Sequence, residues 1–217
     1  QAGLKILARV DHQPDWSRAV PAENGPPDEP EDLADIVSAM VARYGSAGIP
    51  AIQVWNEPNL SREWGNTLIG AHQPYQYVHL LRRASEEAKE TDPNITIISA
   101  GLSPTGTADG TAQPDDVYLQ WMYNAGLARW ADGIGMHGNS YGLPPEAELM
   151  SDPSRPHPSF YFRRVEQVHD RLGLLSLCHQ VAVIDQHARS GREAGPMPFR
   201  VGKLRREPFS LWRTGGG

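Results

Sequence analysis

The sequence has a single cysteine, no long apolar run and no excess of basic residues. One cysteine among 217 residues excludes an intrachain disulfide framework and leaves the redox compartment open. No apolar run is long enough to span a bilayer, and the opening QAGLKILARV lacks the basic start and unbroken apolar stretch of a signal peptide. Because a strand-like segment follows Gln1 directly, we interpret the chain as a fragment or a processed piece. The cellular location stays open, secreted or cytoplasmic.

Basic residues are outnumbered by acidic ones. The chain has 20 Lys and Arg against 26 Asp and Glu, a formal net charge of -6. This balance argues against nucleic acid or an anionic membrane surface as a partner and favours a neutral ligand. The length suits one large domain or a piece of one. No pattern in the sequence indicates an oligomeric state.

Short apolar runs alternate with segments of helical period, the pattern of parallel βαβ units in an α/β protein. The first helix should begin at Pro30 and end at Gly45, because proline is tolerated in the first turn of a helix and glycine often ends one. Its expected buried face contains Leu33, Ile36, Val37, Met40, Val41 and Tyr44. The expected strands lie at 4–10, 49–55, 95–102 and 131–137, and the further helices at 73–93, 115–126 and 160–173.

The final stretch differs from the rest of the chain. Residues 171–217 carry 8 Lys and Arg against 3 Asp and Glu, whereas residues 1–170 carry 12 against 23. Apart from one further strand expected at 181–187, the stretch shows no sustained period. We therefore divide the chain into a domain at 1–170 and an irregular tail at 171–217.

Polar side chains follow each expected strand, where the carboxyl ends of parallel strands meet at one edge of the sheet. Together they could hydrogen-bond a polyhydroxylated ligand and exchange protons with it, and Trp55 and Trp64 would add flat apolar faces for a sugar ring. Pro58 favours an extended backbone at Glu57, which would hold this carboxyl group at the strand tip. The side chains at the strand ends are those of Arg9, Asp11, Asn56, Glu57, His137 and Tyr141.

The segment WNEPN at 55–59 resembles the acid/base strand of retaining glycoside hydrolases built on (β/α)8 barrels. With LARVD upstream and SAGLSPTGT and GMHGNSYG downstream, the chain is most similar to family 39-like and family 5-like enzymes. The resemblance implies that Glu57 is the general acid/base and that Asn56 donates to the sugar 2-hydroxyl. It places Arg9, His137 and Tyr141 around the substrate, and it implies a carbohydrate substrate and no cofactor.

A general acid must be protonated before it acts, and partial burial beside Trp55 is expected to raise the pKa of Glu57. The reaction also needs a second carboxylate as nucleophile. In these families that residue is a Glu at the tip of the seventh strand. Counting from Glu57 on the fourth strand, the seventh falls near 181–187, where Asp185 is the only carboxylate. The count predicts a partial TIM barrel, from about strand 3 to strand 7, without a recognisable nucleophile.

Alternatives remain open at the level of sequence. The chain could be a catalytically inactive, carbohydrate-binding barrel remnant, because one carboxylate cannot complete a double displacement. A metal-dependent barrel hydrolase is a weaker alternative, because none of the eight histidines forms a pair with metal-binding spacing. Three of the candidate site residues could instead have a purely structural role. Arg9 could pair with Asp11, His137 could be a hydrogen-bonded core histidine, and Trp55 could belong to the core.

Overall fold

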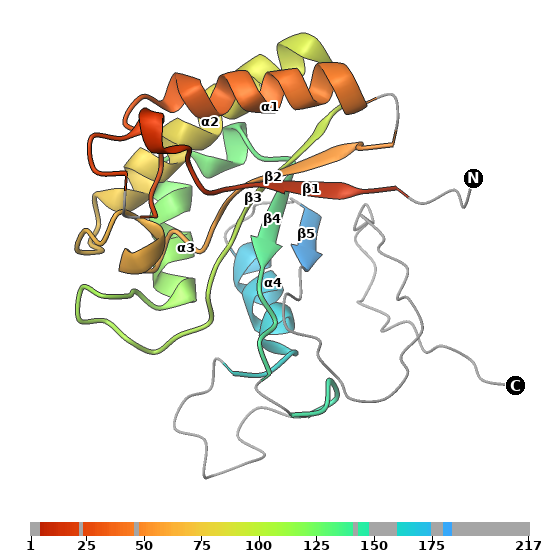
Figure 1. Ribbon diagram of the computed structural model, residues 1–217. Coiled ribbons are helices and arrows are strands. Elements are labelled where there is room, and N and C mark those ends of the chain that lie inside the picture. Colours follow the sequence, from red (N-terminus) through yellow and green to blue (C-terminus); the bar gives the residue numbers. More distant parts are fainter. Residues whose placement is uncertain are drawn as a thin grey trace, which may run out of the picture.

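The computed structural model describes residues 5–21, 24–45, 48–140, 143–147, 160–174 and 180–183. Within these residues five strands form one parallel sheet, and their order in the sheet follows their order in the chain (Figure 1). The α/β prediction is confirmed, and each expected strand is present, including the one near 181–187. The strands are β1 (Leu7–Val10), β2 (Ala51–Asn56), β3 (Thr96–Gly101), β4 (Gly133–Met136) and β5 (Gln180–Val183).

Helices connect successive strands, as parallel pairing requires. Helices α1 and α2 lie side by side on one face of the sheet (Figure 1). None of the helices in the described ranges is long and apolar enough to cross a membrane. The helices are α1 (Pro30–Tyr44), α2 (Gln73–Thr91), α3 (Asp115–Asn124) and α4 (Arg164–Leu174), with short 3-10 helices η1 (Asp15–Ser17), η2 (Ser61–Glu63) and η3 (Leu127–Arg129).

The core lies between the sheet and these helices. Every residue of β2 is buried, as in a parallel strand covered on both faces. The residues of α2 that recur at helical spacing all point into this core, as expected. The prediction for α1 is partly wrong, because Ile36 and Tyr44 are 49% and 41% exposed. The buried α2 side chains are Tyr77, Leu80, Leu81, Ala84 and Ala88.

The strand register brings distant residues to one edge of the sheet. Asn56 at the end of β2 pairs with Gly101 at the end of β3, and Leu102 bridges to Met136 at the end of β4. The residues that follow these strand ends, Glu57 and His137, therefore lie next to each other.

Two predictions concern residues outside the described ranges. Tyr141 and most of the expected tail, residues 184–217, lie outside them. The expected division at residue 170 falls inside α4, which continues to Leu174.

Candidate active site

The backbone turns sharply where β2 ends. Trp55 and Glu57 adopt left-handed conformations, with φ of 72° and 38°. The Glu57 amide still donates to Gly101 O at 3.0 Å, and the Glu57 carbonyl accepts from the amide of Leu60 at 2.9 Å. The predicted extended conformation of Glu57 is therefore wrong, because the chain already turns at this residue. Such strain in residues other than glycine is concentrated at functional sites.

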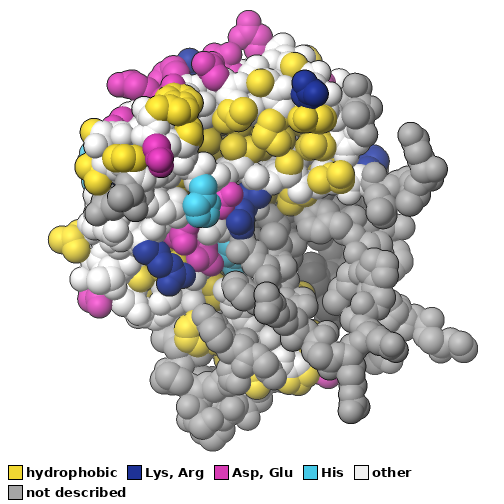
Figure 2. All heavy atoms as spheres, in the orientation of Figure 1, with side chains coloured by type: hydrophobic (Ala, Val, Ile, Leu, Met, Phe, Trp, Pro, Cys, Tyr) yellow, Lys and Arg dark blue, Asp and Glu magenta, His cyan; other side chains and the backbone are white. Residues whose placement is uncertain are grey.

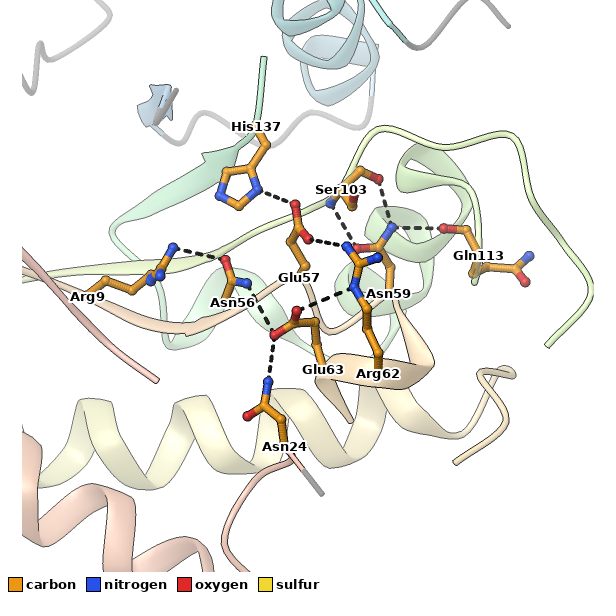
Figure 3. Close-up of polar contacts among 10 residues, drawn as sticks. All are labelled: Arg9, Asn24, Asn56, Glu57, Asn59, Arg62, Glu63, Ser103, Gln113 and His137. Carbon is orange, nitrogen blue, oxygen red and sulfur yellow. Dashed lines mark hydrogen bonds and ion pairs between the residues drawn. The ribbon is translucent and has the colours of Figure 1, made fainter. Parts of the chain in front are cut away.

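The carboxyl group of Glu57 contacts His137, which follows β4. Oε1 of Glu57 lies 2.7 Å from Nδ1 of His137, and the two residues are only 7% and 1% exposed (Figure 3). Gly101 makes room for this contact, since a Cβ at that position would overlap the imidazole ring. The structure thus fixes one carboxyl oxygen inside the protein.

The other carboxyl oxygen faces a cation from η2. Nη2 of Arg62 lies 3.6 Å from Oε2 of Glu57, and Nε of Arg62 lies 3.6 Å from Oε1 of Glu63. The Arg62 side chain is 72% exposed and that of Glu57 only 9%, so Arg62 is the solvent-facing member of this pair. Figure 2 shows acidic, basic and histidine side chains gathered in this part of the surface.

These contacts determine the charge of Glu57. Burial raises the pKa of its carboxyl group, but the hydrogen bond to His137 and the electrostatic influence of that ring lower it, as do Arg62 and the Ser103 hydroxyl. The lowering influences prevail, and the pKa lies below its ordinary value. The expected rise is therefore wrong, because the partners of the carboxylate outweigh its burial.

Asn56 is oriented by two charged neighbours. Nη1 of Arg9 donates to its Oδ1 at 3.1 Å, and its Nδ2 donates to Oε2 of Glu63 at 3.3 Å. The same Glu63 oxygen accepts from Nδ2 of Asn24 at 2.8 Å. Arg9 also pairs with Asp11 at 2.9 Å, so the structural role proposed for Arg9 coexists with its contact to Asn56.

Several site residues were not found from the sequence. Asn59 is fully buried and ties the loop after β2 to the loop after β3: its amide donates to Ser103 O and Gln113 O, and its Oδ1 accepts from the Ser103 amide, each at 2.9 Å. Arg62 and Glu63 come from a 3-10 helix too short to show a period. The available signal was the polar run NLSRE directly after the NEP tripeptide.

The two tryptophans pack in the core. Trp55 is fully buried and Trp64 is 5% exposed, and their rings meet edge to face with centroids 6.2 Å apart. Nε1 of Trp55 donates to Glu63 O at 3.0 Å. Neither ring offers the exposed platform expected for a sugar, and Trp55 instead supports the η2 segment that carries Glu63.

The predictions for Tyr141 and Asp185 and the alternative of a metal site remain to be considered. Tyr141 and Asp185 lie outside the described residues. In the part of the chain that the structure describes, no three His, Cys, Asp or Glu residues are grouped so as to hold a metal ion.

No family model and no curated protein matches this sequence. Solved structures do match it. A glucosidase from Croceicoccus marinus matches with a TM-score of 0.51 and 12% identity over 82% of this chain. A family 39 glycoside hydrolase from Bacteroides cellulosilyticus WH2 matches with a TM-score of 0.49 and 21% identity over 73% of this chain. A family 44 endoglucanase from Clostridium thermocellum matches with a TM-score of 0.43 and 17% identity over 70% of this chain.

The glucosidase match, with its TM-score of 0.51, shows a resemblance to a glycoside hydrolase at the level of fold. The chain spans only 34%, 30% and 39% of the length of these three proteins, about a third of each.

Proposed function

We propose that this chain is the part of a (β/α)8-barrel glycoside hydrolase that carries the general acid/base, and that this residue is Glu57. The observation that carries the proposal is the position of its carboxyl group. It is buried at the carboxyl edge of a parallel sheet, with one oxygen on His137 and the other turned toward the exposed Arg62. Active sites of barrel enzymes are built at this edge.

The two carboxyl oxygens of Glu57 would have different roles. Because His137 occupies Oε1, the proton exchanged with a glycosidic oxygen would travel through Oε2. Arg9 and Glu63 fix the amide of Asn56 at the same edge, where the resemblance assigns contact with the sugar 2-hydroxyl. The substrate class is carbohydrate, which agrees with the neutral ligand favoured by the charge of the chain.

The five strands fit a consecutive portion of a barrel. A parallel sheet whose spatial order equals its chain order is what one arc of a (β/α)8 barrel contains. In this proposal β1 to β5 correspond to barrel strands three to seven. The glucosidase match supports this arrangement, and it covers 82% of the chain.

A retaining mechanism requires a second carboxylate about 5 Å from the acid. Among the described residues Glu63 is a carboxylate close to Glu57, but its Oε2 accepts from Asn24 and Asn56 and its Oε1 faces Arg62. These contacts suit a group that positions Asn56 better than one that attacks a sugar. The same observation favours the alternative function, a carbohydrate-binding remnant without turnover.

Aryl glycosides test the proposal. Turnover by the purified chain should fall about 10²- to 10⁴-fold in Glu57→Gln for a phenyl glycoside, because general acid catalysis typically contributes this factor. For a 2,4-dinitrophenyl glycoside, whose leaving group needs little protonation, kcat/KM should fall much less. Glu90→Gln, an exposed position on α2, is the matched control.

The outcomes separate the two functions. Turnover that is insensitive to Glu57→Gln would contradict the assignment of the acid/base. Saturable sugar binding without turnover would support the remnant.

A further inference from the structure

The two oxygens of Glu57 differ in what a ligand could reach. Oε1 lies against His137, whose side chain is fully buried, whereas Oε2 lies 3.6 Å from Arg62, whose side chain is 72% exposed. A ligand that approaches from solvent therefore meets the guanidinium of Arg62 before it meets the carboxyl group.

Arg62 is held loosely in this position. Both of its contacts with carboxylates, to Glu57 and to Glu63, are 3.6 Å long, beyond the usual 2.7 to 3.2 Å of an N–H to O hydrogen bond. Ion pairs of long, solvent-exposed side chains are weak and are screened by salt. The side chain can therefore leave Glu57 at little cost, and Glu63 remains beside it as a partner.

A substrate and this cation compete for Oε2 of Glu57. The glycosidic oxygen must come within hydrogen-bond distance of the acid, which is the space that Arg62 covers. A positive charge beside Glu57 also opposes its protonation, which an acid requires.

We propose that Arg62 is a displaceable cation, which covers Oε2 of Glu57 in the ligand-free protein and moves away toward Glu63 when a glycoside occupies the site. The inference rests on the function proposed above and adds to it a role for Arg62 as a positioning residue. Ligand binding would then draw a proton onto Glu57 and convert the resting carboxylate into the acid.

Other charged groups around Glu57 are held more firmly than Arg62. Their side chains range from fully buried to 32% exposed, and none of them covers Oε2. They are His137 after β4, Glu63 on η2, and, through Asn56, Arg9 and Asp11 at the end of β1.

Carboxyl ¹³C NMR of the chain labelled at glutamate Cδ gives a direct test, with the Glu57 signal assigned from its loss in Glu57→Gln. The probe is a p-nitrophenyl thio-β-D-glucoside, in which sulfur replaces the glycosidic oxygen and prevents cleavage. Wild-type protein should show a higher Glu57 titration midpoint with the thioglycoside than without it. In Arg62→Gln the ligand-free midpoint should already be raised, and the further shift on binding should be smaller.

A matched control and an opposite variant sharpen the test. Arg43→Gln makes the same exchange at an exposed arginine in the last turn of α1 and should leave the midpoint unchanged. Glu63→Gln removes a negative charge near Glu57 and leaves Arg62 only one carboxylate, so the ligand-free midpoint should fall. An unchanged midpoint in Arg62→Gln, or an equal ligand-induced shift in Arg62→Gln and wild type, would overturn the proposal.

A second measurement distinguishes failure of the proposed function from failure of the Arg62 displacement alone. If isothermal titration calorimetry detected no binding of the thioglycoside or of other β-linked sugars, both the function and the displacement would be overturned. If sugar bound and left the Glu57 midpoint unchanged, only the displacement would be.

Discussion

Glu57 is subject to opposing influences at the scale of a single residue. Burial favours its neutral form, while His137, Arg62 and Ser103 favour the carboxylate and prevail. A carboxyl group whose pKa is lower in the folded than in the unfolded protein stabilises the fold while it is ionised. That stability is fully present above the unfolded pKa of about 4.3 and is lost as the pH falls through the folded value.

The difference in unfolding free energy between wild type and Glu57→Gln should therefore depend on pH. We expect the wild-type advantage to shrink as the pH falls below about 4.3, because the carboxyl group is then protonated first in the unfolded protein. Urea unfolding of both proteins at several pH values measures this difference. An advantage that grows as the pH falls would show that the pKa is raised instead.

Gly101 permits the contact between Glu57 and His137. A Cβ in Gly101→Ala would overlap the imidazole ring, and relief of such overpacking typically costs about 1–3 kcal/mol of stability. The displaced ring should also release Glu57, so the midpoint of its titration should rise. Gly70→Ala is the control, since its Cβ would meet only the Gln73 side chain at 3.9 Å. A Gly101→Ala protein with an unaltered Glu57 midpoint would contradict this role.

Sequence reasoning found the residues that a motif or a strand end marks. Arg9 and Asn56 lie near the ends of strands of clear pattern, Glu57 and His137 directly follow such strands, and parallel pairing brings the four together. The contacts of Arg62 were not foreseen, because they depend on how the loop after β2 folds back over the strand end. The pKa direction of Glu57 was wrong for the same reason, since burial can be anticipated from sequence but the partners cannot.

At the scale of elements, a buried ion pair joins α3 and α4. Arg164 on α4 donates through Nε and Nη2 to the two carboxylate oxygens of Asp115 at 3.0 and 2.7 Å, and Asp115 is fully buried. Removing one member of such a pair leaves the other charge buried and without a partner, which is destabilising. Asp115 begins α3, so the pair fixes where α4 docks.

Arg164→Met should therefore destabilise the chain by about 3 kcal/mol, the cost typical of breaking a buried pair. The double variant with Asp115→Leu should recover much of this loss, because no buried charge is left unpaired. Arg163→Met removes the neighbouring, more exposed pair with Glu166 and should cost about 0.5 kcal/mol. If urea unfolding gave equal losses of stability for Arg164→Met and Arg163→Met, burial of Asp115 would not explain the cost of breaking its ion pair.

Helix boundaries followed from the sequence where proline and periodicity mark them, as in α1 and α2. The buried face of α1 was less well predicted. Its apolar stripe includes Ile36 and Tyr44, but a stripe shows only which residues could be buried, and the described part of the chain leaves these two exposed.

At the scale of the whole molecule, the sheet has β1 and β5 at its edges. Figure 2 shows hydrophobic side chains gathered between α1 and β1, and the exposed large apolar residues include Ile6, Ile36 and Tyr44. In the proposed barrel, neighbouring βα units would pack here. Within the described residues, no further strand pairs with the outer edge of β1 or β5, and such an edge beside apolar surface favours association.

We expect the isolated chain to associate as its concentration rises, and Ile36→Lys to reduce this by placing a charge on the apolar surface. Leu68→Lys, at a residue that is 73% exposed in the loop after η2, should have little effect. Sedimentation velocity over a range of concentrations measures the association. A wild-type chain that remains monomeric throughout would argue against an uncovered face.

The bond between Glu57 and His137 joins residues 80 positions apart, and β3 lies between the strands that carry them. It can form only after β2 has paired with β3 and β3 with β4. Long-range parallel pairings of this kind are slow steps in folding. Titration of Glu57 therefore also reports whether β2, β3 and β4 are assembled, since a species in which β4 is detached would lose the influence of His137 on this carboxyl group.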